Sequence, residues 1–311
     1  MEKKQKLIVI LGPTASGKTK LAVALAAEIG GEIISADSRQ VYRGMNIGTG
    51  KDYEEYEHAS GQKIRYHLID VVEAGEAYQV ARFQKDFRNV YQDIMNRGKV
   101  PILCGGSGMY MEAVLKNYQH IQVPVDEVLR AESEKESYDE LLKQFQENYQ
   151  KIYPQADTST KKRLIRAMEV ARFMQDNPEH SQTTEPYPAL IFGISIPTEV
   201  RRERITRRLY KRLESGMIEE VKDLLSQGIN PEKLIFYGLE YKFITEYLIG
   251  QLTYDEMVSK LEVAIHQFAK RQMTFFRSME KKELTIHWLD GMDTTENLVN
   301  HIISQIDNEN I

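Results

Sequence analysis

Cysteine is nearly absent from this sequence, and its scarcity excludes several kinds of site. Cys104 is the only cysteine among 311 residues, so no disulfide can form within the chain. The seven histidines are scattered, and neither a CxxC nor an HxxxH spacing is present, which excludes the common zinc motifs. We therefore expect a protein of a reducing compartment, the cytoplasm.

Long hydrophobic runs are also missing. No stretch approaches the roughly 18 consecutive apolar residues that a membrane span requires, so we expect no membrane partner. The segment LIVIL at 7–11 follows MEKKQK but is shorter than the apolar region of a signal peptide, and we interpret it as a β-strand. With 41 basic and 46 acidic residues the formal charge is −5, which still allows nucleic-acid binding through a local basic surface.

Short apolar segments alternate with helical patterns, and this alternation predicts a parallel α/β sheet. We expect strands at 7–11, 32–36, 66–71, 100–104 and 189–196. Helical spacing covers 20–29 and 253–279, where Phe268 and Phe275 are expected to face the core, and residues 198–227 are expected to form one long helix. The acidic segment 125–147 predicts a helical insertion. The expected domains are a core of residues 1–118 and 186–311 and an insertion of residues 119–185, with a peripheral tail from Asp293 onward.

The segment GPTASGKT matches the phosphate-binding pattern G-x-x-x-x-G-K-[ST] and lies between an expected strand and an expected helix. Backbone N–H groups of such a loop bind a polyphosphate, the lysine adds a positive charge, and the threonine hydroxyl can ligate Mg²⁺. We therefore predict a P-loop NTPase-like fold, Mg²⁺ as cofactor with Thr19 as its ligand, and a diphosphate site made of Gly12, Pro13, Thr14, Ala15, Ser16, Gly17, Lys18 and Thr19.

Four polar residues, Asp37 to Gln40, follow the second expected strand. In a parallel sheet they emerge at the carboxyl edge beside the P-loop, where α/β proteins bind ligands. An isolated aspartate after a strand more often caps a turn. Its place beside a phosphate loop favours a role in the site.

Five segments, in this order, closely resemble the motifs of the tRNA dimethylallyltransferase family, in its bacterial form without a zinc finger. They are GPTASGKT, DSRQVYRGMNIGTGK at 37–51, GGSGMY at 105–110, KRLIRAMEV at 162–170 and AKRQMTFFR at 269–277. The resemblance implies transfer of a dimethylallyl group from dimethylallyl diphosphate to the exocyclic N6 amine of the adenine on the 3′ side of the anticodon, in tRNAs reading codons that start with U. It also implies a monomer that binds the anticodon stem-loop.

The resemblance further implies roles for single residues. Asp37 would accept the proton of the amine while the adenine is flipped into a channel, and Ser107 stands where threonine is usual. Lys18 and Arg208, the latter within an R-I-x-x-R pattern, would bind the diphosphate. The tRNA contacts would come from Asp37, Ser38, Arg39 and Gln40, from Lys162, Arg163, Leu164, Ile165 and Arg166, and from Lys270, Arg271, Gln272 and Arg277.

One motif departs from the family pattern. NIGTGKD replaces the usual DIGTAKP, so Asn46 stands in place of an aspartate and the proline after Lys51 is lost. We therefore assign no catalytic role to this segment.

Two other functions are compatible with a P-loop. A small-molecule kinase shares the loop and a helical lid. A nucleotide-switched RNA-binding module would need only the loop and the basic patches, without a positioned base.

Overall fold

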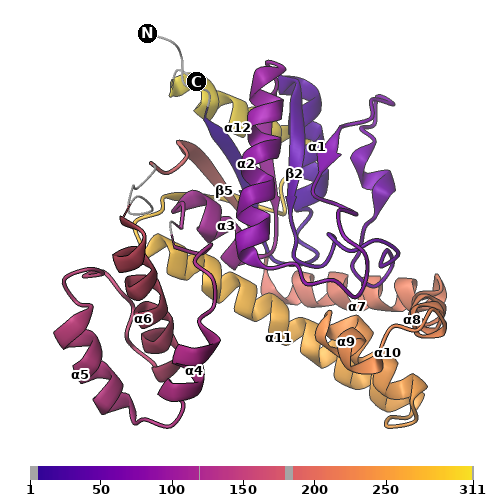
Figure 1. The fold of residues 1–311 in the computed structure, drawn as a ribbon. Helices are drawn as coiled ribbons and strands as arrows, with labels where there is room; N and C mark the ends of the chain where they lie inside the picture. The colour runs from indigo at the N-terminus through magenta and orange to yellow at the C-terminus, as the bar shows by residue number, and fades with distance from the viewer. Residues whose placement is uncertain (1–5, 119, 179–184, 310–311) are drawn as a thin grey trace. The chain divides into compact units, whose positions relative to one another are not determined.

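The computed structural model describes residues 6–118, 120–178 and 185–309. Its centre is a six-stranded, entirely parallel sheet with the order β3-β2-β4-β1-β5-β6, which confirms the expected α/β class (Figure 1). The strands are β1 (Leu7–Leu11), β2 (Gly31–Ala36), β3 (Tyr66–His67), β4 (Val100–Gly105), β5 (Ala189–Ser195) and β6 (Ile286–Asp290).

Two strands differ from expectation. The segment expected as a strand at 66–71 forms only the two-residue β3, because Leu68 and Asp70 take positive φ angles of 62° and 55° that end the extended backbone. Strand β6 was not predicted. It adds to β5 at the edge of the sheet, with Ile191 opposite Ile286.

Each face of the sheet packs against its own helices. Alternate side chains of β1 point to opposite faces: Leu7, Val9 and Leu11 join one core, whereas Ile8 and Ile10 join the other. The first core includes α2 (Val80–Asn96) and α3 (Gly108–Leu115), and the second includes α1 (Lys18–Ile29) and α12 (Thr295–Asn308). The prediction of a peripheral tail from Asp293 onward is wrong, because α12 buries apolar side chains of its own against α1.

The remaining helices of this unit follow β5 and pack with the first core. They are α7 (Thr198–Glu214), α8 (Met217–Ser226), α9 (Pro231–Phe236), α10 (Leu239–Leu248) and α11 (Tyr254–Glu280). The single helix predicted over 198–227 is broken between α7 and α8, because Gly216 adopts a left-handed φ of 95°. Met217 and Val221 are nevertheless buried, so the apolar spacing continues past the break and hides it in the sequence.

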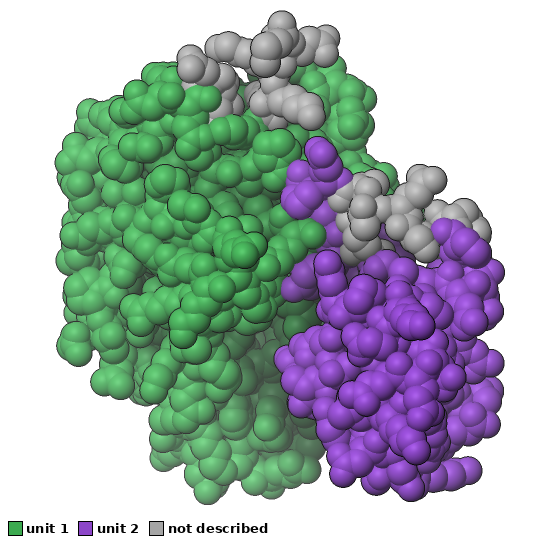
Figure 2. All heavy atoms as spheres, turned by 90° about the vertical axis from the view of Figure 1, so that its left-hand side faces the viewer, with its two compact units in different colours: residues 1–116, 187–311 green, residues 117–186 purple. Residues whose placement is uncertain are grey.

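The chain divides into two compact units, residues 1–116 with 187–311 and residues 117–186, close to the expected limits of the insertion at 119 and 185 (Figure 2). The insertion contains α4 (Glu127–Ser133), α5 (Tyr138–Asn148) and α6 (Lys161–Asp176) around its own apolar core. A capping box of Ser137 and Glu140 starts α5. Within the described residues, no helix is both long and apolar enough to cross a bilayer.

Candidate active site

The phosphate loop connects β1 to α1 and has the backbone that its glycines permit. Gly17 has a φ of 86°, in the left-handed region that glycine adopts without strain. A Cβ at Gly12 would lie 2.6 Å from the hydroxyl of Ser16, so the loop closes tightly at this point. Lys18 opens α1, and its burial lowers the pKa of its ammonium group, although Cys104 and Asp37 oppose the change. The loop therefore presents backbone N–H groups and a partly desolvated lysine.

A glutamine from α11 braces this loop. Gln272 is buried; its Oε1 accepts a hydrogen bond from the Thr14 N–H at 2.9 Å, and its Nε2 donates to the Gly106 carbonyl at 2.9 Å. We expected Gln272 to contact tRNA, and the residue also lines the cavity described below. Its amide joins the phosphate loop to the turn after β4.

The ends of β2 and β4 bring Asp37 and Ser107 together. Ala36 pairs with Gly105, and a Cβ at position 105 would lie 2.2 Å from the Ala36 carbonyl oxygen, so only glycine allows this approach. The Ser107 hydroxyl accepts a hydrogen bond from the Ser38 N–H at 2.9 Å, and Asp37 Oδ1 accepts one from the Arg39 N–H at 2.9 Å. Both side chains are thus fixed at the carboxyl edge of the sheet.

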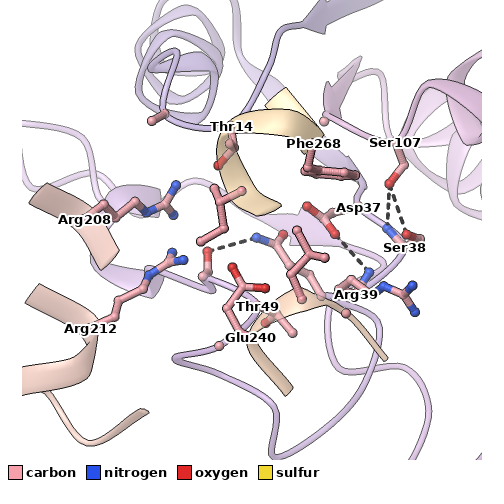
Figure 3. Close-up of a pocket in the computed structure, with 18 of the residues that line it drawn as sticks. Thr14, Asp37, Ser38, Arg39, Thr49, Ser107, Arg208, Arg212, Glu240 and Phe268 are labelled. Carbon is pink, nitrogen blue, oxygen red and sulfur yellow. Dashed lines mark hydrogen bonds between the residues drawn. The ribbon is translucent and has the colours of Figure 1, made fainter. Parts of the chain in front are cut away.

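A cavity of about 810 Å³ lies at this edge and is lined by residues of the core unit. Its wall includes most of the predicted site residues of this unit: Thr14, Ala15, Gly17, Lys18, Thr19, Asp37, Ser38, Arg39, Gln40, Ser107, Arg208 and Gln272. Figure 3 shows the guanidinium groups of Arg208 and Arg212 on one side and the Asp37 carboxylate on the other. The cavity therefore has a cationic side facing a carboxylate.

The cationic side comes from α7, which contributes five basic residues to the wall: Arg204, Arg207, Arg208, Lys211 and Arg212. Two carboxylates, Glu55 and Glu240, line the same cavity, and burial raises the pKa of Glu240 although Arg212 opposes the change. Phe268 was expected in the core, but the residue is 41% exposed and lines the cavity. Phe275 was also expected to face the core, and it is half-buried and packs against the first core.

Gln40 was expected to contact tRNA, and its amide has two partners in the structure. Its Oε1 accepts a hydrogen bond from the Ser35 hydroxyl at 3.1 Å, and its Nε2 donates to the Gly50 carbonyl at 3.0 Å. Gln40 thus ties the end of β2 to the loop at Gly50.

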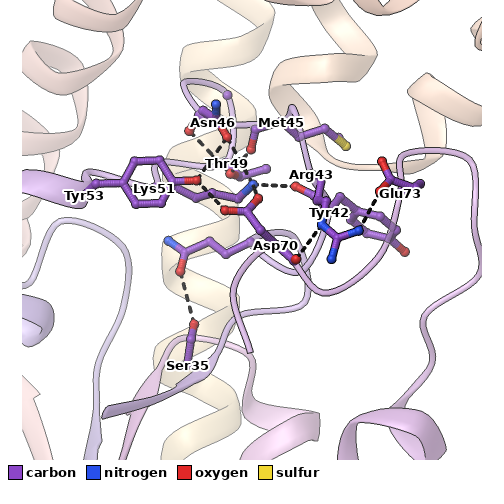
Figure 4. A network of polar contacts seen from close by, with 12 residues as sticks. Ser35, Tyr42, Arg43, Met45, Asn46, Thr49, Lys51, Tyr53, Asp70 and Glu73 are labelled. Atoms are coloured by element: carbon purple, nitrogen blue, oxygen red, sulfur yellow. Dashed lines mark hydrogen bonds and ion pairs between the residues drawn. The ribbon is translucent and has the colours of Figure 1, made fainter. Parts of the chain in front are cut away.

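The segment left without a catalytic role, NIGTGKD, is held by a buried polar network (Figure 4). The Lys51 ammonium is fully buried; it donates to the Tyr42 carbonyl, to Asn46 Oδ1 at 3.2 Å and to Asp70 Oδ1 at 2.5 Å. The Tyr53 hydroxyl donates to the second Asp70 oxygen at 2.5 Å. Burial lowers the pKa of Lys51, and its bond with Asp70 opposes that change. The network sets the course of the loop between β2 and the following 3₁₀ turn, Tyr53–Tyr56.

The sequence analysis missed Arg212, Glu55 and Glu240 in the cavity wall, and it also missed Asp52 behind that wall. Asp52 Oδ2 accepts hydrogen bonds from Arg208 Nη2 at 2.6 Å and from Arg212 Nη2 at 3.4 Å. The loss of the usual proline after Lys51 marked this position as unusual. Nothing in the sequence indicated its partners, which lie 156 and 160 residues further along the chain.

The predicted tRNA-binding segment of the insertion divides into exposed and internal residues. Lys162 and Arg163 are exposed on α6, although Arg163 pairs with Asp157 at 2.8 Å. Leu164 and Ile165 are buried in the core of the insertion, so their side chains do not reach a surface ligand.

Arg166 is also engaged within the insertion. It pairs with the buried Glu169 at 2.8 Å and donates to the carbonyls of His120 and Val123. On α11 of the core unit, by contrast, Lys270, Arg271 and Arg277 are exposed.

Comparison with known proteins gives consistent results across sequence and structure. A family model described as IPP transferase matches residues 40–279. The chain is 51% identical to a tRNA dimethylallyltransferase 2 of Bacteroides fragilis, over 95% of this chain and 96% of that protein. It is also 51% identical to a tRNA dimethylallyltransferase 1 of Parabacteroides distasonis, over 94% and 95%.

Solved structures agree with these relatives. A tRNA isopentenylpyrophosphate transferase of Bacillus halodurans superimposes with a TM-score of 0.72 at 32% identity and covers 99% of this chain and 98% of that one. A eukaryotic dimethylallyltransferase described as acting on tRNA has a TM-score of 0.75 at 23% identity, over 98% of this chain and 80% of that one. At this identity the comparison shows a similar fold and nothing more.

Proposed function

The chain belongs to the IPP transferase family, the tRNA dimethylallyltransferases, and from this premise we propose how its residues perform the transfer. The substrates are dimethylallyl diphosphate and tRNA. The acceptor is the exocyclic N6 amine of the adenine on the 3′ side of the anticodon in tRNAs that read codons starting with U, and the products are N6-dimethylallyladenosine and diphosphate. The enzyme acts as a monomer in the cytoplasm. The kinase alternative is not favoured by any of the relatives compared.

The observation that carries the proposal is the position of Asp37 in the wall of a cavity whose other side is cationic. As the amine nitrogen bonds to the allylic carbon, the bond from that carbon to the diphosphate oxygen breaks. The amine then loses a proton, and a carboxylate within hydrogen-bond reach accepts it. One Asp37 oxygen is held by the Arg39 N–H, which fixes the carboxylate for this task.

The leaving diphosphate gains negative charge as the bond breaks, and fixed cations stabilise that charge. We assign this role to the P-loop N–H groups, Lys18 and Arg208, with Arg212 beside it. The adenine, flipped out of its stack, enters from the side of Asp37 and Ser107. The transfer is thus a displacement at carbon, and no phosphoryl group moves.

A Mg²⁺ ion fits this site through the diphosphate. Among the described residues no group of three or more histidine, cysteine, aspartate or glutamate side chains could hold a metal. Thr19 lines the cavity, and the buried Ser16 hydroxyl has no hydrogen-bond partner in the described part of the chain. Thr19 would therefore hold an ion that arrives with the diphosphate, and that ion would neutralise charge on the leaving group.

We propose that exposed cations bind the tRNA backbone: Lys162 and Arg163 on α6, and Lys270, Arg271 and Arg277 on α11. Ser38 and Arg39 remain candidates for the nucleotide that enters the cavity. Such contacts neutralise phosphates, so tRNA affinity should fall steeply with salt.

The test is incubation with labelled dimethylallyl diphosphate, Mg²⁺ and tRNA that lacks the modification, followed by nucleoside analysis. We expect label on the N6 of adenosine. Asp37→Asn should lower kcat about a hundredfold or more and leave the Kd for tRNA unchanged. Normal turnover by this variant would refute the assigned base, and ATP-dependent phosphorylation in place of labelling would favour the kinase.

A further inference from the structure

Two guanidinium groups share one carboxylate oxygen beside the cavity. Asp52 Oδ2 lies 2.6 Å from Arg208 Nη2 and 3.4 Å from Arg212 Nη2. Both arginines line the cavity, whereas Asp52 is absent from the described lining. The carboxylate therefore contacts the cationic wall without occupying the space that a ligand would fill.

A counter-charge and free space are both present where the two arginines meet the carboxylate. The side chain of Arg212 is 14% exposed, and burial and the charge of Arg208 lower its pKa, while Asp52 opposes that change. A Cβ at Gly50 would lie 1.8 Å from Arg212 Nη2 and 2.7 Å from Arg208 Nη2. Glycine at position 50 thus provides the space, and Asp52 provides the charge.

Asp52 is ionised at neutral pH. Burial raises the pKa of its carboxyl, but Arg208 and Arg212 outweigh that effect and bring the pKa below its ordinary value of 3.8. A permanent negative charge next to two guanidinium groups reduces their net charge from +2 to +1. An anion on the other side of the arginines then meets a weaker positive potential than the arginines alone would create.

We propose that Asp52 is a positioning residue that holds Arg208 and Arg212 together and lowers the affinity of the site for diphosphate. The inference rests on the proposed function, in which these arginines face the diphosphate. Substrate and product carry the same diphosphate group, so a cationic wall without Asp52 would hold both more tightly. Binding that is equally strong before and after reaction does not accelerate the chemical step, and it slows product release. Asp52 thus limits retention of the product.

The test measures binding of inorganic pyrophosphate with Mg²⁺ to the full chain by titration calorimetry. For a separation of about 8 Å, removal of one negative charge facing a magnesium pyrophosphate of about two negative charges corresponds to about sixfold in Kd in a water-like dielectric. We therefore expect Asp52→Asn to bind pyrophosphate about sixfold more tightly and to lower the KM for dimethylallyl diphosphate, with the KM for tRNA unchanged. Equal or weaker pyrophosphate binding would overturn the proposal.

The matched control is Glu54→Gln, which makes the same charge change at an exposed position of the 3₁₀ turn that Asp52 precedes. It should alter the Kd less than about twofold; an increase in affinity equal to that of Asp52→Asn would show a general charge effect and overturn the specific role. Asp52→Ala serves if the asparagine variant unfolds.

A double variant tests whether Asp52 acts through its partner. In an Arg208→Met background, the gain from Asp52→Asn should shrink to about half or less on a logarithmic scale, and an undiminished gain would contradict the proposed coupling. If the unaltered chain did not bind pyrophosphate at all, the diphosphate site of the proposed function would itself be wrong. If the unaltered chain bound pyrophosphate and only the Asp52 variants behaved otherwise than expected, the diphosphate site would stand and the role of Asp52 alone would be wrong.

Discussion

Substitution of the buried glutamine behind the phosphate loop should reduce stability and diphosphate binding together. Gln272→Ala removes two hydrogen bonds of 2.9 Å and leaves the Thr14 N–H and the Gly106 carbonyl without their partner. A buried polar group without a partner costs about 1–3 kcal/mol. Gly106 is buried and Thr14 is half-buried, so water can replace the bond only at Thr14. We expect the free energy of unfolding to fall by about 2–4 kcal/mol.

The assay is thermal unfolding followed by circular dichroism, together with calorimetric titration of pyrophosphate. For a chain of this size the expected loss corresponds to a midpoint lowered by about 3–6 °C, and pyrophosphate affinity should fall because the loop loses its support. Gln267→Ala is the matched control, since Gln267 lies on the same helix and is exposed. A Gln272→Ala variant with an unchanged midpoint and weaker tRNA binding would refute the brace and support a tRNA contact.

Three further variants test the site and the fold. Lys18→Ala should weaken pyrophosphate binding and leave the salt-dependent affinity for tRNA nearly unchanged; titrations of both ligands check this, and equal losses would contradict separate sites. Gly50→Ala should weaken pyrophosphate binding about tenfold or more, because its Cβ would lie 1.8 Å from a guanidinium nitrogen, whereas Gly44→Ala has a similar φ and no atom within 4 Å of the new Cβ and should bind normally. Burial raises the pKa of Glu32, but hydrogen bonds from Arg97 and a neighbouring histidine outweigh it and lower the pKa from 4.5 to about 2, so stability present above pH 4.5 should be lost as the pH falls toward 2. Glu32→Gln should remove this part of the acid dependence in unfolding measurements, and an unchanged pH profile would count against it.

The sequence was sufficient for β1, β4 and β5 because each of these strands is a short and largely apolar run. Strand β6 contains His287 and Asp290 and was missed. Segments 7–11, 100–104 and 189–196 were found within a residue of their observed limits, since strands buried on both faces leave an unbroken apolar signal. Helix breaks carry a weaker signal. Gly216 interrupts the helix without disturbing the apolar spacing, and a lone glycine inside a helical pattern is often tolerated.

The candidate site was predictable where a local motif fixes the geometry. Residues 12–17 and Asp37 lie on loops whose position follows from the strand before them, and Lys18 and Thr19 begin the helix that follows. Asp52 and Gln272 required the fold, because their roles depend on contacts across more than 150 residues of chain. A charged or amide side chain looks the same in a sequence whether it faces solvent or braces a buried loop.

The way in which the insertion joins the core unit affects how the sequence can evolve. The segment starts and ends at neighbouring points, since Asn117 Nδ2 donates to the Glu185 carbonyl at 3.2 Å, and it has an apolar core of its own. A segment whose ends meet can lengthen, shorten or be exchanged at little cost to the rest of the chain, because loop closure depends only weakly on loop length. Residues 117–186 can thus change in length and sequence while the sheet and its phosphate loop stay constant.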